Sequence, residues 1–260
     1  MRYSRICAAP PMTTTDRGVV LVTRSEPGAT ELVTALVAAG YAAVGCPVLD
    51  VQRIDDANAR RTLQRLDRFD IAIFVSSHAV RFAFESIDDR AISRVAIEWI
   101  AVGGATAAAL ARHGIVALVP AAESSEGILA LSQLSDVVGK HILLCAGEGG
   151  RTTIAEALVA RGADVQTVAL YRRHAVAADS LRQLVPEPGA IRAVVVSSGE
   201  GGAAFATLWR SIGNGAVAVV APSQRVANEL AGLGFDRVAV SNGAGPAAVI
   251  ATLEHIEGRR

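Results

Sequence analysis

The sequence is poor in cysteine, in clustered metal ligands and in net charge, and each shortage excludes a class of protein. Its three cysteines, Cys7, Cys46 and Cys145, show no CxxC spacing, which argues against a disulfide framework and for a reducing compartment. The scattered cysteines and histidines have no metal-ligand spacing, so we expect no metal site. A formal net charge of zero provides no overall field for nucleic acid or anionic lipid.

Long hydrophobic runs are also missing. No apolar stretch reaches the roughly 20 residues that a membrane-spanning helix needs. Residues 1–17 lack the continuous apolar segment of a secretory signal and predict a disordered tail. We therefore expect a cytoplasmic protein without a membrane partner.

The hydrophobic content is high, at 51% of residues, although aromatic residues make up only 4%. This mixture is typical of helices packed on buried parallel strands. Short β-branched runs alternate with amphipathic stretches, which predicts an α/β fold with parallel sheets. The strand candidates are Val19–Val22, Ile71–Val75, Ile100–Val102, His141–Cys145, Ala193–Val196 and Val217–Val220.

An internal duplication is visible in three types of unit that occur twice in the same order. The first unit, strand–turn–helix–Gly–strand, covers residues 20–44 and again 142–165. The second is a strand that ends in a serine pair, at Ser76-Ser77 and Ser197-Ser198, and the third is a strand, a small-residue turn and a helix. The copies are offset by about 120 residues throughout, which favours two related lobes.

The stretches that follow the first unit in each copy suggest how the lobes are connected. If both stretches cross between lobes, lobe 1 is discontinuous (18–46 plus 172–260) and lobe 2 covers 47–171. The crossing strands, near 47–51 and 168–172, would then run antiparallel. Two consecutive domains that divide near Gly139 remain an alternative.

Candidate binding residues lie where strands end and helices begin, because open parallel sheets bind ligands at that edge. Small and hydroxylated residues there leave amides and hydroxyls for an anion, although they are also ordinary helix caps. Two lobes facing one another would form a cleft lined by such donors. The candidates are Thr23, Arg24, Ser76, Ser77, Gly103, Thr106, Arg151, Ser197, Ser198 and Ser223.

Tyr171 is the candidate catalytic residue, since it is one of three tyrosines and lies on an expected crossing strand. A packing role with the hydroxyl in water is the alternative. No GxGxxG, GxxxxGK[ST], GxSxG or HExxH motif is present, so dinucleotide, P-loop, hydrolase and zincin classes are not indicated.

The ordered set of VTRSE, IFVSSHAV, AVGGATAAAL, SSEGIL, LLCAGEGGR, VALYRR and VVVSSGEGG resembles the uroporphyrinogen-III synthase family from about Val19 to Leu253. The resemblance implies two flavodoxin-like parallel-sheet lobes joined by a two-stranded linker. It implies that a cofactor-free, monomeric lyase cyclises hydroxymethylbilane to uroporphyrinogen III, with loss of water and inversion of ring D. A transient hand-over from hydroxymethylbilane synthase would supply the substrate.

The same resemblance implies that Tyr171 assists departure of the substrate hydroxyl and that Ser76, Thr106 and Ser197 line the cleft. Gln224 and Ser77-His78 depart from the residues common in the family. A non-catalytic two-lobed binding or regulatory protein for an anionic metabolite is the alternative function.

Overall fold

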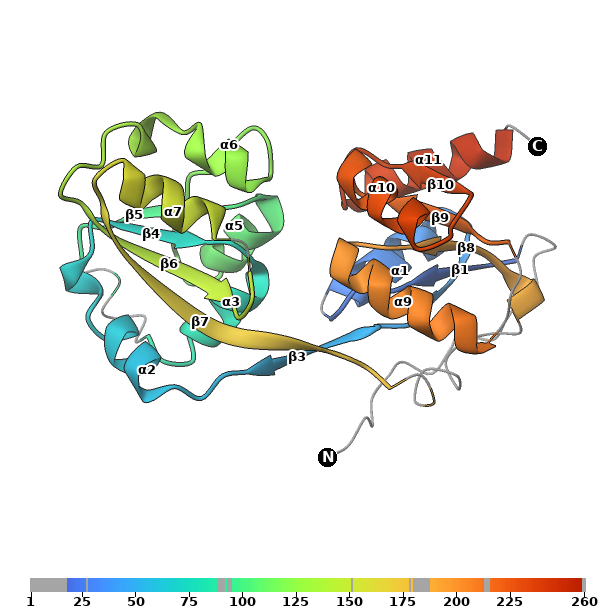
Figure 1. Cartoon of the computed structure of the whole chain (residues 1–260), viewed down its shortest axis with the longest axis horizontal. Coiled ribbons are helices and arrows are strands. Elements are labelled where there is room, and N and C mark those ends of the chain that lie inside the picture. The colour runs from blue at the N-terminus through green and yellow to red at the C-terminus, as the bar shows by residue number, and fades with distance from the viewer. Residues whose placement is uncertain are drawn as a thin grey trace. The chain divides into compact units, whose positions relative to one another are not determined.

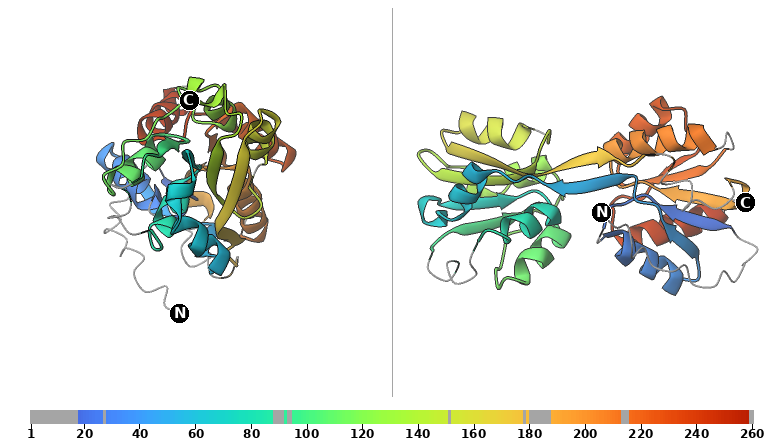
Figure 2. Two further views of the ribbon diagram at one scale, coloured as in Figure 1. Left: turned by 90° about the vertical axis from the view of Figure 1, so that its left-hand side faces the viewer. Right: turned by 90° about the horizontal axis from the view of Figure 1, so that it is seen from below.

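The computed structural model describes residues 18–26, 28–87, 92, 95–150, 152–177, 179, 188–212 and 216–258. The expected tail over residues 1–17 lies outside these ranges. The chain divides into two compact units, residues 1–50 with 174–260 (unit 1) and residues 51–173 (unit 2). Each unit is built on one five-stranded sheet with helices on both of its faces (Figures 1 and 2).

Unit 1 contains a fully parallel sheet with the order β10-β9-β8-β1-β2. Numbered along the chain within the unit, these strands follow the 2-1-3-4-5 order of flavodoxin-like folds. The strands are β1 (Val19–Val22), β2 (Ala42–Gly45), β8 (Ile191–Val195), β9 (Ala218–Ala221) and β10 (Val238–Val240); the helices are α1 (Gly28–Ala38), η3 (Pro188–Ala190), α9 (Gly199–Ile212), α10 (Gln224–Gly232) and α11 (Pro246–Gly258).

Alternation along the buried strands places two separate cores on the two faces of this sheet. Leu21 and Val194 pack with α9 and α10, whereas Val20, Val22 and Val195 pack with α1 and α11. Because successive residues of a strand point to opposite faces, a continuous apolar run such as Val19–Val22 fills both cores.

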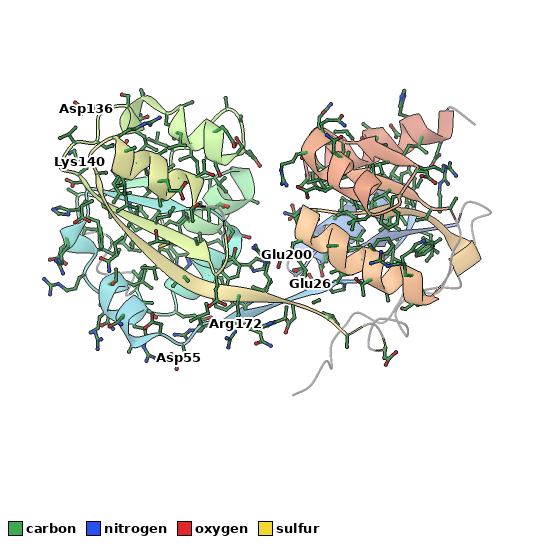
Figure 3. All side chains as sticks on the ribbon, in the orientation of Figure 1. Glu26, Asp55, Asp136, Lys140, Arg172 and Glu200 are labelled. Atoms are coloured by element: carbon green, nitrogen blue, oxygen red, sulfur yellow. The ribbon has the colours of Figure 1, made fainter. Side chains whose placement is uncertain are left out.

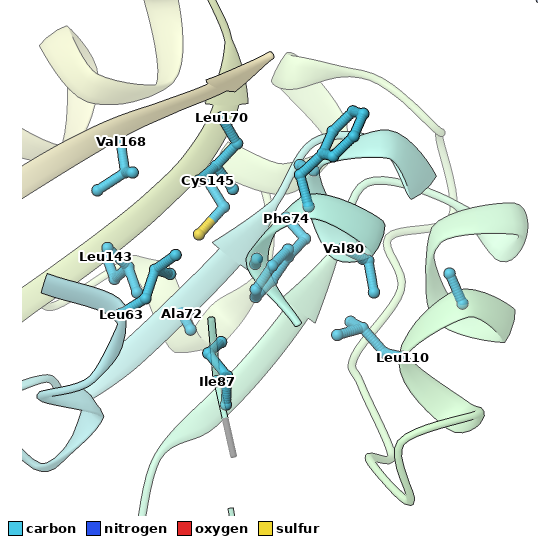
Figure 4. Packing of buried hydrophobic residues seen from close by; sticks show 14 of the residues in the cluster. Leu63, Ala72, Phe74, Val80, Ile87, Leu110, Leu143, Cys145, Val168 and Leu170 are labelled. Atoms are coloured by element: carbon cyan, nitrogen blue, oxygen red, sulfur yellow. The ribbon is translucent and has the colours of Figure 1, made fainter. Parts of the chain in front are cut away.

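Unit 2 has the sheet order β3-β7-β6-β4-β5, in which β7, β6, β4 and β5 are parallel. Its strands are β3 (Leu49–Arg53), β4 (Ile71–Phe74), β5 (Glu98–Ala101), β6 (His141–Gly147) and β7 (Asp164–Ala175), of which β3 and β7 extend into unit 1; its helices are α2 (Ala57–Leu63), η1 (Leu66–Arg68), α3 (Ser77–Ala83), α5 (Gly104–Ala111), α6 (Ser125–Leu129), η2 (Ser132–Leu134) and α7 (Thr153–Ala160). One face packs Phe74, Leu143 and Cys145 under α2, α3 and α5 (Figure 4). The other face packs Ile73 and Leu144 under α6 and α7.

The order of strands confirms the duplication. In unit 2, β6 and β7 occupy the places that β1 and β2 occupy in unit 1, and β4 and β5 occupy those of β8 and β9. A parallel bridge between Ile100 and Leu118 stands where unit 1 has β10. The two-lobed α/β fold is therefore confirmed, with the difference that β3 makes the second sheet mixed.

The pairing of β1 shows that unit 1 is assembled from both ends of the chain. This strand pairs with β8, Leu21 lying beside Val194, although 173 residues separate them along the chain. Antiparallel pairing of β3 with β7 is marked by two backbone bonds, Val176 N–H to Val48 O and Ile54 N–H to Leu170 O, both 2.9 Å. These pairings exclude the alternative of two consecutive domains that divide near Gly139. None of the helices in the described part of the chain has both the length and the hydropathy that a membrane span requires.

Candidate active site

The carboxyl ends of β4, β5 and β6 define one edge of unit 2, called here the unit 2 rim. In Figure 3, Lys140 lies just before β6 begins, at the opposite end of the unit from Arg172 on β7. The first polar residues after β4, β5 and β6 are therefore gathered on one side. Most of the candidate residues of unit 2 lie at this rim.

The rim brings Tyr171 and Ser76 into contact. The Tyr171 hydroxyl lies 2.9 Å from Ser76 Oγ, although 95 residues separate the two along the chain. Ser76 is the N-cap of α3, and its Oγ also accepts the N–H of Ala79 at 3.0 Å. The tyrosine is 3% exposed, whereas the serine is half-buried. The alternative role of Tyr171, packing with its hydroxyl in bulk water, is therefore not what is observed.

An irregularity in the β6–β7 pairing aims Tyr171 at this site. Ala146 pairs with Ala169, but the next residue, Gly147, pairs with Tyr171, so Leu170 is the additional residue of a bulge. A bulge turns the following side chain to the other face of the sheet. For this reason Leu170 and Tyr171, adjacent in sequence, are both buried in the same core cluster.

Aromatic and charged groups surround the Tyr171 ring. Its centroid lies 5.6 Å from that of His78 and 6.2 Å from that of Phe82. The guanidinium carbon of Arg173 lies 5.8 Å from the ring centroid, a cation–π distance. A Cβ atom on Gly147 would lie only 2.7 Å from two ring carbons, so the ring packs directly on the backbone there.

The remaining candidates of unit 2 that the structure describes lie at the amino ends of α3 and α5. Ser77 is the first residue of α3 and is half-buried. Gly103 is the N-cap of α5, and the next amide, Gly104 N–H, donates to the Glu123 carboxylate at 2.8 Å. Thr106, in the first turn of α5, is 3% exposed. The protein's own carboxylate thus already bonds the amide beside Gly103, a contact that sequence reasoning did not predict.

In unit 1, the first two candidates bond within their own unit. The hydroxyl and the N–H of Thr23, which is 3% exposed, both donate to Val195 O, at 3.0 and 3.1 Å. Its hydroxyl proton therefore serves the β1–β8 pairing and cannot also be donated to a carboxylate. Arg24 donates from Nη1 to Ala244 O at 3.3 Å and packs over Gly28, which leaves its other guanidinium protons for a ligand.

Two of the three candidate serines of unit 1 act as caps at the equivalent edge of its sheet. Ser198 Oγ accepts Gly201 N–H at 3.1 Å in the first turn of α9, and Ser223 Oγ accepts Val226 N–H at 3.4 Å as the N-cap of α10. Ser197 is half-buried and lies two residues after the end of β8. Each capping oxygen keeps its own proton for a ligand, so capping and binding are compatible. Arg151, a candidate in the sequence range of unit 2, lies outside the described residues.

Neither buried cysteine suits chemistry at these rims. Burial raises the pKa of the Cys46 thiol to about 12 and also raises that of Cys145, so both stay protonated at neutral pH. Among the residues that the structure describes, no group of three or more His, Cys, Asp or Glu side chains could hold a metal ion. Cys7 lies outside those residues.

The fold and the strand ends together define a class of protein, a two-unit α/β protein whose strand ends present hydroxyls and amides. Such groups are the ones that bind anionic small molecules. The family model described as uroporphyrinogen-III synthase HemD matches residues 30–251. The chain belongs to the uroporphyrinogen-III synthase family.

Curated relatives and solved structures agree with this assignment. The chain is 34% identical over 189 residues to the uroporphyrinogen-III synthase of Escherichia coli K12, a match that covers 70% of this chain and 76% of the relative. It is 33% identical over 186 residues to that of Salmonella typhimurium, with the same coverage. The fold resembles uroporphyrinogen-III synthetase from Helicobacter pylori (TM-score 0.61, 15% identity, covering 94% of this chain and all of the other). It also resembles a structure of uroporphyrinogen III synthase from Thermus thermophilus (TM-score 0.59, 15% identity, covering 92% and 97%).

Proposed function

We propose that this chain is a lyase that cyclises hydroxymethylbilane to uroporphyrinogen III, with loss of water and inversion of ring D, in tetrapyrrole biosynthesis. The observation that carries the proposal, in a chain of this family, is the pair of hydroxyls formed by Tyr171 and Ser76 at the unit 2 rim. A paired, largely buried phenol is suited to assist a leaving group by proton donation.

The chemistry needs little more from the protein than a proton and a fixed geometry. The substrate carries both the leaving hydroxyl and the pyrrole carbon that attacks, so no nucleophile from the chain is required. Departure of hydroxide leaves an electrophilic, azafulvene-like end group, and holding ring D close to it gives the advantage of an intramolecular reaction. Tyr171 is the catalytic residue of this proposal.

Carboxylates of the substrate would be bound by neutral donors rather than by a field of charge. Hydroxyls that cap helices can donate to a carboxylate while they accept an amide N–H, as the geometry of Ser198 and Ser223 allows. Free guanidinium protons of Arg24 would add a charge-assisted bond. The same binding role is proposed for Ser77, Gly103, Thr106, Arg151, Ser197, Ser198 and Ser223, whereas Thr23 is left out because its proton is used in the sheet.

The setting of the enzyme is part of the proposal. We place it in the cytoplasm as a monomer without a cofactor, receiving its short-lived substrate directly from hydroxymethylbilane synthase. The buried, free thiols of Cys46 and Cys145 support a reducing compartment.

The test is the isomer ratio of the product. Purified protein is supplied with hydroxymethylbilane, the product is oxidised to porphyrin, and the type I and type III isomers are separated. We expect type III to dominate with the protein and type I without it. A protein that binds the substrate but leaves type I as the product would be the non-catalytic binding protein instead.

A further inference from the structure

The two hydroxyls of the Tyr171–Ser76 pair are unequally placed. Tyr171 is 3% exposed and belongs to the hydrophobic core of unit 2, whereas Ser76 is half-buried at the rim. A substrate that approaches the rim would therefore reach Ser76 Oγ before it reaches the phenol. The proposed function makes Tyr171 the source of the proton, and this difference in burial raises the question of how that proton reaches the substrate.

The number of hydrogen bonds that the Ser76 hydroxyl can make indicates which member of the pair donates to the other. A serine hydroxyl has two acceptor lone pairs and one proton. Ser76 Oγ accepts Ala79 N–H at 3.0 Å and lies 2.9 Å from the Tyr171 hydroxyl, in a bond where either oxygen could be the donor. With Tyr171 as donor, both lone pairs are used and the proton of Ser76 is left for a ligand.

We infer that Ser76 donates its proton to the departing hydroxyl of the substrate and that Tyr171 donates a proton to Ser76 in turn, so that the two hydroxyls form a proton relay. This inference rests on the proposed function and assigns the direct contact to Ser76. In the step, the carbon–oxygen bond of the substrate breaks and its electron pair leaves with oxygen. That oxygen takes the Ser76 proton and becomes water, while the Tyr171 proton moves to Ser76 Oγ.

The step leaves Tyr171 as a phenolate. After ring closure the new macrocycle must lose one proton to restore its pyrrole, and this proton returns through Ser76 to Tyr171. The protein ends unchanged, and the net loss from the substrate is one water. The cationic guanidinium of Arg173, 5.8 Å from the ring centroid, lies where it stabilises the transient negative charge.

The groups around the Tyr171 ring keep its hydroxyl within hydrogen-bonding distance of Ser76. Tyr171 packs on the backbone at Gly147 on one side and against Phe82 and His78 on others. The bulge at Leu170 fixes which face the side chain takes. These contacts fix the position of the ring. The hydroxyl oxygen lies on the long axis of the ring, so rotation about that axis also leaves the oxygen opposite Ser76.

The test compares Ser76→Ala with Tyr171→Phe and with a matched serine. Ser124 is the N-cap of α6 in the same unit and accepts Gly127 N–H at 3.0 Å, so Ser124→Ala removes a cap of the same kind from a helix without the tyrosine. Turnover of hydroxymethylbilane and product isomers are measured for each variant, after thermal melting shows that it is folded.

A relay predicts that Ser76→Ala and Tyr171→Phe lose similar rate, tens-fold to about a thousandfold in kcat, and that the double variant is no slower than either. Ser124→Ala should turn over like wild type, and Ser76→Thr, which keeps a hydroxyl, should recover most of the rate. Wild type should show a curved dependence of kcat on the deuterium fraction of the solvent, because two protons move together, and Ser76→Ala should show a linear one.

Near-normal turnover of Ser76→Ala beside a slow Tyr171→Phe would overturn the relay and return the direct contact to Tyr171. A loss in Ser124→Ala equal to that in Ser76→Ala would also overturn it, since loss of a cap would then explain both. Failure of wild type to produce the type III isomer is a different result, because it refutes the proposed function itself.

Discussion

Gly147 provides a way to move the Tyr171 hydroxyl without removing it. It ends β6, and the substitution Gly147→Ala would place a methyl carbon 2.7 Å from Tyr171 Cε2 and Cζ and 3.0 Å from its hydroxyl oxygen. Ordinary contact between carbon atoms needs about 3.5–4.0 Å. The ring must therefore shift by roughly 1 Å, and the 2.9 Å bond to Ser76 lengthens or breaks.

The rate should suffer more than the stability. Misplacement of a catalytic group by about 1 Å can cost on the order of 100-fold, and we expect a loss of about 10- to 100-fold in kcat for Gly147→Ala. Overpacking a core typically costs about 1–3 kcal/mol, so the variant should still fold. The assay is turnover of hydroxymethylbilane with isomer analysis, beside chemical unfolding of each variant.

Gly45→Ala is the matched control, because Gly45 also ends a parallel strand and a Cβ there meets nothing within 4 Å. It should leave turnover unchanged. In a Tyr171→Phe background the Gly147→Ala change should slow the enzyme little further, since the hydroxyl is already gone. Full activity of Gly147→Ala alone, with stability lowered as expected, would refute the idea that the position of this phenol matters.

Three further predictions concern binding, acid stability and thiol reactivity. Ser198→Ala should weaken substrate binding by only about 1 kcal/mol, measured as KM, because one neutral bond is lost; a loss of several kcal/mol would contradict distributed recognition. The pKa of Asp70 is lowered, chiefly by the backbone N–H of His141 at 2.8 Å and also by Lys140, so its stabilising contribution is present above the unfolded pKa and is lost as pH falls through the lower folded value. The difference in free energy of unfolding between wild type and Asp70→Asn should therefore shrink below about pH 4 in urea titrations, and a constant difference would refute this role. Cys46 and Cys145, whose pKa values are raised by burial, should react with a thiol reagent only after denaturant is added, which counting labelled thiols by mass spectrometry would check.

Sequence periodicity was sufficient for most of the fold. Apolar runs such as Val19–Val22 and Ile71–Phe74 became buried central strands, because a strand covered on both faces must be apolar throughout. The strand β10 (Val238–Val240) was not among the expected strands. It is short, lies at the edge of its sheet and is only half-buried, so it has no strong hydrophobic signal.

The sequence indicates the position of the candidate residues relative to the strands, but it does not predict their hydrogen-bond partners. The sequence places Thr23 and Ser223 alike after strands, yet one hydroxyl is bonded within the sheet and the other caps a helix. That difference depends on which carbonyl lies within about 3 Å, a tertiary distance with no local sequence signal. The carboxylate of Glu123 at the start of α5 was missed for the same reason.

The sequence by itself determined the α/β class and the duplication and singled out Tyr171 as a candidate, because periodicity, repeated order and family motifs are local properties of the chain. Only the tertiary structure decided that Tyr171 meets Ser76. The contact needs β6 and β4 to be neighbours in one sheet and a bulge at Leu170 to turn the tyrosine to the face of α3. A shift of one residue in strand register reverses the face of every side chain beyond it, and no pattern in the sequence marks where that shift falls.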